Sequence, residues 1–182
     1  KKLGMDHASI KKINSKAIYA HISGFGDNDP RVAYDLVLQA ETGFMSMNGT
    51  KQSGPLKMPV AMIDILAAHQ LKEAILLALL NRAKTGKGAY VSVSLFDAAV
   101  ASLANQATNW LMAGHLPGLE GSLHPNIAPY GEIFTTSDKK HIVLAVGSDR
   151  QFLLLCEVLK CPELCKNSKF CTNLLRVKNR VL

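Results

Sequence analysis

A single carboxylate interrupts the longest apolar tract of this 182-residue chain. The tract reads PVAMIDILAAHQLKEAILLALL over residues 59–80, and Asp64 lies between Ile63 and Ile65 near its start. An isolated carboxylate is costly to place among apolar side chains, so it needs a structural partner or a chemical use. A carboxylate can attack an acyl carbon and form a covalent intermediate, which makes nucleophilic catalysis the chemistry to consider here.

The local pattern leaves two structural positions for Asp64 open. If Pro59 is the first residue of the helix, Asp64 lies inside it and must face a cleft or a partner. If the preceding segment is extended, Asp64 caps a helix that begins at Ile65, and its carboxylate accepts backbone amide hydrogens. The five apolar residues before Asp64 favour an apolar pocket around it. A carboxylate in such a pocket, at the positive end of a helix, fits the description of a nucleophile.

The cysteines do not predict a metal site. They lie close together in the sequence, at Cys156, Cys161, Cys165 and Cys171. Their spacing, C-x4-C-x3-C-x5-C, lacks the paired C-x2-C of most structural zinc sites, and no histidine lies near them. We therefore expect four free thiols, with Cys156 on the buried face of a helix, and no bound metal.

Composition and charge narrow the class of protein. With 48% hydrophobic and 19% charged residues, the chain is globular, and its net charge is +7. There is no zinc finger and no basic strand interleaved with aromatic residues, so we expect no nucleic-acid partner, whereas a phosphorylated metabolite would be attracted by the same charge. Charged residues interrupt the apolar tract before it could span a membrane, and KKLGMDHASIKK has no apolar segment of a signal peptide. We expect a cytoplasmic protein with no membrane contact.

The elements that must position Asp64 follow from hydrophobic periodicity. We predict strands at AIYAHISGFG and AYVSVSL, a hairpin from YGEIFTT and HIVLAVG, and helices over residues 32–45, 59–85, 96–112 and 150–160. Strands that alternate with helices, followed by a hairpin and a helix, indicate an α/β fold with a domain boundary within 113–128.

Several consecutive stretches resemble the class III CoA-transferases, the CaiB/BaiF family, which includes formyl-CoA transferase and alpha-methylacyl-CoA racemase. The stretches cover nearly the whole chain and include LGMDHASIKKIN, IYAHISGFG, YDLVLQAETGFMSMNG, the apolar tract with its continuation to VSLFDAA, HPNIAPYGEIFTTSD and IVLAVGSDRQFLLLCEVL. The resemblance implies that residues 1–112 are the central part of a large Rossmann-like domain. Residues 113–128 are then a linker, and 129–182 begin a smaller α+β domain.

The resemblance also implies an activity and a role for Asp64. Asp64 occupies the place of the family's nucleophilic aspartate, which attacks an acyl-CoA thioester to give a mixed anhydride and then an aspartyl-CoA thioester. A carboxylic acid acceptor repeats the exchange in reverse. CoA is thus moved between two acids as a substrate, and no bound cofactor is required. Family members form interlocked homodimers.

Other site residues carry over one at a time. Tyr34 stands where formyl-CoA transferase has a tyrosine near CoA and where the racemases have a catalytic histidine, which argues against racemisation; packing of Tyr34 in the core is the structural alternative. Asp149 falls near the second acid-base carboxylate of the racemases, although a helix-start role suffices for it. The loop with Gly121 and His124 aligns with the family's segment over the active site, so we place both near substrate or CoA.

Two departures from the family leave alternatives open. The family has glycine four residues after the nucleophile, and this chain has Ala68. Family members are about twice as long, so the chain resembles an internal fragment. A 2-methylacyl-CoA racemase or epimerase, and a truncated homologue without catalytic activity, therefore remain the alternatives to a CoA-transferase.

Overall fold

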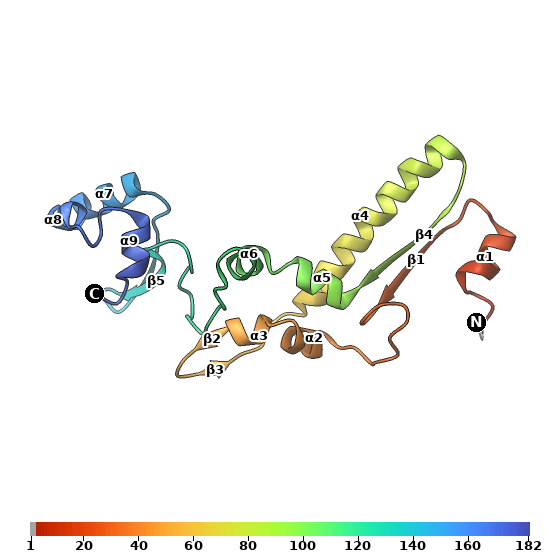
Figure 1. Ribbon diagram of the computed structural model, residues 1–182, viewed down its shortest axis with the longest axis horizontal. Helices are drawn as coiled ribbons and strands as arrows, with labels where there is room; N and C mark the ends of the chain where they lie inside the picture. Colours follow the sequence, from red (N-terminus) through yellow and green to blue (C-terminus); the bar gives the residue numbers. More distant parts are fainter. Residues whose placement is uncertain (1–2) are drawn as a thin grey trace. The chain divides into compact units, whose positions relative to one another are not determined.

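The computed structural model describes residues 3–182, which form two compact units (Figure 1). The first unit runs to Asn48 and resumes over Pro55–Pro117, and the second comprises Gly49–Gly54 and Gly118–Leu182. The short segment Gly49–Gly54 therefore goes with the second unit, although it lies inside the 1–112 range that we assigned to the large domain. The mixture of helices and strands in the two units is the predicted α/β class.

Two parallel strands form the sheet of the first unit. Strand β1 (Ile18–Ser23) pairs with β4 (Ala89–Ser94) in a register that runs from Ile18 opposite Ala89 to Ser23 opposite Ser94. Parallel neighbours need a long crossover, and here it contains the long helix α4 (Met62–Thr85), which packs along both strands (Figure 1). Gly86 ends α4 in the left-handed conformation at φ 69°, which glycine adopts without steric cost.

The remaining helices of the first unit are shorter than predicted. The expected helix over residues 32–45 is two helices, α2 (Asp35–Glu41) and α3 (Phe44–Met47), because Gly43 between them adopts φ 88°. The expected helix over 96–112 is likewise two, α5 (Leu95–Ala101) and α6 (Ala104–Ala113), and Ala104 at the break has φ 50°. Helix α1 (His7–Ile13) begins after an Asp6 cap. Left-handed residues end helical hydrogen bonding, and apolar periodicity alone does not reveal them.

The core of the first unit lies where α2, α4 and α5 meet. Leu38, Ile63 and Ala99 are fully buried there, one from each helix, and Phe25 and Phe96 pack against them. Ile63 directly precedes Asp64 in the chain. This buried cluster therefore also supports the first turn of α4, which carries the candidate nucleophile.

The second unit contains the predicted hairpin, β5 (Tyr130–Thr135) and β6 (His141–Ala145), which pair in antiparallel fashion. Three helices follow, at α7 (Asp149–Val158), α8 (Glu163–Lys166) and α9 (Asn173–Lys178), and the two-residue strands β2 (Gly49–Thr50) and β3 (Gly54–Pro55) pair with each other. Ser148 caps α7 by accepting the Gln151 amide hydrogen, the arrangement of a capping box.

The cysteines contribute to the core of the second unit. Cys156 is 1% exposed beside Phe152, and Cys161 and Cys165 pack against it. All four cysteines are free thiols, and the predicted burial of Cys156 is confirmed. Burial, and then the neighbouring thiols, raise the pKa of Cys156 to about 12. These thiols act as small apolar side chains in a packed cluster.

Residues 3–182 lack two features. Among them, no helix is sufficiently long and apolar to cross a bilayer. The same residues contain no group of three or more histidine, cysteine, aspartate or glutamate side chains arranged to hold a metal ion.

Candidate active site at the start of helix α4

Helix α4 begins at Met62, and neither predicted position of Asp64 is correct. Asp64 is the third helical residue, in the first turn, so it is neither deep inside a helix from Pro59 nor the cap of one from Ile65. The N-cap residue is Ala61, which has no side chain able to accept a hydrogen bond. The start of this 24-residue helix therefore depends on an acceptor from elsewhere.

Helix α2 supplies that acceptor. Asp35 is the first residue of α2, and its Oδ1 accepts the backbone N–H of Ile63 at 2.8 Å. Its other oxygen, Oδ2, accepts the side-chain amide of Gln39 at 2.6 Å, one helical turn later. A carboxylate distant in sequence thus caps α4, which explains why Asp64 is not needed as the cap.

The carboxylate of Asp64 is free within the described chain. It is exposed, and among residues 3–182 no hydrogen bond or ion pair engages its oxygens. It lies at the positive end of the α4 dipole, which favours negative charge. A carboxylate with unoccupied lone pairs at a helix start can approach an electrophilic carbonyl carbon as a nucleophile.

Ala68 lies one turn after Asp64 on the same face of α4, and it is exposed. The Ala68 methyl group therefore points out of the packed part of the unit, on the side where Asp64 is accessible. It narrows the approach to the helix surface there by the width of one methyl group.

Tyr34 precedes α2 directly and is 68% exposed. The alternative in which it packs in the core is wrong for this structure. Its backbone carbonyl accepts the Leu38 amide hydrogen, and the next residue is the Asp35 that caps α4. Tyr34 and Asp64 thus belong to the same unit and are linked through Asp35 and Ile63.

The predicted binding residues Gly121 and His124 lie in the second unit. Gly121 adopts φ 64°, and its N–H donates to the Gly49 carbonyl at 2.7 Å, so it serves a turn that favours glycine. The Nδ1 of His124 accepts the Asn126 amide hydrogen at 3.1 Å, and its ring packs edge-on against Tyr130. The His124 ring retains Nε2 for a ligand.

Asp149, the predicted second acid-base group, is engaged in an ion pair. It lies in the first turn of α7, and its Oδ1 accepts from Arg176 Nη2 at 2.7 Å. Arg176 is 3% exposed, and it also donates to the carbonyl oxygens of Ala128 and Phe170. Asp149 therefore balances a buried guanidinium, which gives it a structural role.

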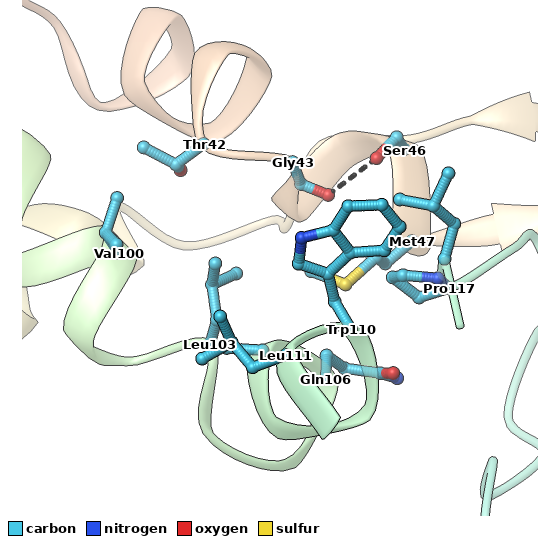
Figure 2. A pocket seen from close by; sticks show the side chains of 12 residues that line it. Thr42, Gly43, Ser46, Met47, Val100, Leu103, Gln106, Trp110, Leu111 and Pro117 are labelled. Atoms are coloured by element: carbon cyan, nitrogen blue, oxygen red, sulfur yellow. Dashed lines mark hydrogen bonds between the residues drawn. The ribbon is translucent and has the colours of Figure 1, made fainter. Parts of the chain in front are cut away.

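An apolar pocket of about 380 Å³ lies between the α2–α3 and α5–α6 segments of the first unit (Figure 2). The Trp110 indole is at the centre of Figure 2, with Leu103 and Leu111 to its lower left, and Met47 also lines the pocket. Its polar lining groups are hydroxyl and amide side chains, at Thr42, Ser46 and Gln106. The pocket can hold an apolar group, and its lining residues include no histidine, cysteine, lysine or carboxylate.

Sequence reasoning missed a polar cluster on one face of the first unit's sheet. Asp27 accepts hydrogen bonds from Tyr90 and Ser92, both at 2.9 Å, and lies 3.0 Å from His21 Nδ1. These bonds, that of Tyr90 foremost, hold the pKa of Asp27 below its usual value. The polar residues that alternate along both predicted strands could have indicated this cluster, but only with knowledge of how the two strands are aligned in the sheet.

Comparison with known proteins gives a consistent result over the whole chain. The family model described as CoA-transferase family III matches residues 1–181. The succinate–glutarate CoA-transferase of Agrobacterium fabrum is 38% identical over 99% of this chain and 45% of its own length. The human succinyl-CoA:glutarate CoA-transferase is 36% identical over 98% of this chain and 41% of its own length.

A solved structure agrees with these relatives. The crystal structure of a CaiB/BaiF family protein from Brucella suis superimposes with a TM-score of 0.77 at 42% identity, covering 99% of this chain and 48% of that one. The chain thus spans less than half the length of the relatives that it matches. A family match over nearly every residue, together with the shared fold, shows that this chain belongs to the CoA-transferase family III.

Proposed function

We propose that Asp64 is the nucleophile of a CoA-transferase that moves CoA from a dicarboxylic acyl-CoA to a second dicarboxylic acid. The observation that supports this most directly is that the Asp64 carboxylate, at the start of α4, is unengaged among the described residues. Asp35 caps α4 in its place. A nucleophile needs free lone pairs in a fixed position, and this arrangement supplies both.

The reaction proceeds by acyl exchange on one carboxylate. An Asp64 oxygen attacks the thioester carbonyl of the donor, the C–S bond breaks, and a mixed anhydride and CoA thiolate result. The thiolate then attacks the aspartyl carbonyl carbon, releasing the donor acid as its carboxylate and leaving an aspartyl-CoA thioester. The acceptor carboxylate repeats these steps in reverse, so no net proton is consumed.

The apolar surroundings of Asp64 in sequence support this chemistry. Water would hydrolyse either intermediate, so the reaction requires a site from which water is excluded. Val60 and Ile65 lie near Asp64 in the sequence and are each 47% exposed, so their apolar surface remains available to a bound acyl-CoA. Tyr34, in place of a histidine, supports transfer over racemisation, because a tyrosine is a poor base near neutral pH.

The proposed substrate class rests on the relatives. Two of them carry names that pair succinyl and glutaryl groups, at 38% and 36% identity. We therefore propose succinyl-CoA as donor and glutarate as acceptor for the first assay. The net charge of +7 favours such polyanionic substrates over neutral ones.

The test uses the complete gene product with succinyl-CoA and glutarate. We expect glutaryl-CoA to form and, when hydroxylamine is added during turnover, a hydroxamate on the peptide that contains Asp64, detected by mass spectrometry. The adduct should be absent from the Asp64→Asn variant and present in Asp97→Asn, which alters an aspartate at the same position of α5. Full transferase activity of Asp64→Asn would contradict the proposal.

We also propose that the complete protein is a homodimer. Helix α4 exposes Leu76, Leu77 and Leu80 to between 53% and 67%, and a helix that is apolar on several faces is normally covered by protein. Analytical ultracentrifugation of the complete gene product tests this directly. A monomer at micromolar concentration would refute it.

A further inference from the structure

We propose that Gln39, acting through Asp35, is a positioning residue for Asp64. This inference rests on the proposed function, because it concerns how α2 fixes the place of the nucleophile. Gln39 is completely buried although it is polar, which is costly unless both ends of its amide are bonded.

Both ends of the Gln39 amide bind the segment that leads into α4. Its Oε1 accepts the backbone N–H of Met58 at 2.7 Å, and its Nε2 donates to Asp35 Oδ2 at 2.6 Å and lies 3.5 Å from the Val60 carbonyl oxygen. One side chain thus ties together the approach to α4 and the carboxylate that caps α4.

The residue next to Asp64 is consequently fixed in two ways. The backbone N–H of Ile63 is held by Asp35, and its side chain is buried against Leu38, which lies on α2 between Asp35 and Gln39. A shift of Asp35 would move the first turn of α4 and its third residue, Asp64. Misplacing a reacting group by about 1 Å is able to cost about 10²-fold in rate.

The donor and acceptor pattern of the pair allows a swap experiment in the complete gene product. Gln39→Glu sets a carboxylate against Asp35, and Asp35→Asn sets an amide NH2 against that of Gln39. In the double variant, the new amide at position 35 donates to the new carboxylate at position 39. The side chain at position 35 still accepts the backbone N–H of Ile63, and the side chain at position 39 still accepts that of Met58.

We expect each single variant to lower kcat by about 10²-fold, with KM within about threefold of the unmodified protein, because neither residue is required to touch substrate. The double variant should recover most of the loss. Glu41→Gln, at the far end of α2 and paired with Arg31, is the control and should leave kcat unchanged. Circular dichroism and melting curves establish that each variant is folded.

Single variants that melt earlier but keep their kcat would overturn the proposal, as would a double variant no better than the singles. Failure of the proposed function gives a different result, in which Asp64→Asn remains fully active. Hydrogen exchange of the Ile63 amide in Asp35→Ala reports the cap itself without any assay of activity, and unchanged protection there would overturn the capping step of the inference.

Discussion

The starts of helices α4 and α5 place an aspartate at the same position and use it differently. Asp64 and Asp97 are each the third residue of their helix. In α5, Ser94 accepts the Asp97 amide hydrogen at 2.9 Å and donates its hydroxyl hydrogen to Asp97 Oδ2 at 2.6 Å. In α4 the N-cap residue is Ala61, and the cap comes from Asp35.

The difference shows how a helix start can hold a carboxylate for chemistry. Helix α5 supplies its own cap, and that cap engages its own first-turn carboxylate. Helix α4 receives its cap from a neighbouring helix, so Asp64 stays unengaged while the turn that carries it is held in place. The free carboxylate is therefore a property of the contact between α2 and α4.

The largest expected effect tests the two aspartates directly. Asp64→Asn should lower CoA transfer by the complete gene product on the order of 10⁴-fold or more, because the amide is a poor nucleophile and the covalent route is lost. Asp97→Asn should keep its activity within a few-fold, since that carboxylate only serves a cap. Steady-state kinetics with succinyl-CoA and glutarate measure both, and equal losses would refute the distinction.

The next effect concerns a third first-turn aspartate, Asp149, whose carboxylate is engaged by Arg176. Arg176→Met should lower the free energy of unfolding by roughly 2–4 kcal/mol, because the buried carbonyl acceptors of Ala128 and Phe170 lose their donor. Asp64→Asn should change it by less than about 0.5 kcal/mol. Chemical denaturation measures both, with the exposed Arg150→Met as control; a neutral Arg176→Met would contradict the assigned role.

A smaller effect concerns the caps themselves. Ser94→Ala should destabilise the protein by about 1 kcal/mol, because α5 has a local cap to lose. Ala61→Ser should gain less than this, because Asp35 already holds the Ile63 amide and the start of α4, which leaves the Asp64 amide as the donor that a serine at the N-cap would bind. Thermal unfolding of both variants checks the pair, and a gain as large as the loss would mean that Asp35 is a weak cap.

The smallest expected effect concerns Asp27, an exposed carboxylate that accepts hydrogen bonds from Tyr90 and Ser92. Because the pKa of Asp27 is lowered in the folded state, its contribution to stability is present above the ordinary value of 3.8 and is lost as the pH falls below it. Asp27→Asn should therefore flatten the pH dependence of the melting temperature in this acidic range. A decline unaffected by Asp27→Asn would contradict the assignment.

Much of the fold was predictable from the sequence. The strands β1 and β4, the hairpin of β5 and β6, the Gly86 end of α4 and the Ser148 cap of α7 all carry local signals, and all are present. The helix breaks at Gly43 and Ala104 were missed, because the apolar pattern continues across them while the backbone turns.

The candidate site was predictable only in part. Asp64 was identifiable as a carboxylate out of place in an apolar tract, but its position in the helix was wrong in both interpretations. The signal for its neighbours was the spacing of Asp35 and Gln39, one helical turn apart in YDLVLQAE. That spacing indicates a shared helix face, and it does not reveal what the face contacts.

The sequence by itself determined the family, the alternation of strands and helices, and the presence of one carboxylate at the start of the longest apolar helix. These features depend on local periodicity and on motifs that are contiguous in the chain. The tertiary structure decided which carboxylate is free and which is used as a cap. That choice depends on the hydrogen bond from Ile63 to Asp35, 28 residues apart in sequence, and such a bond exists only after α2 and α4 have packed.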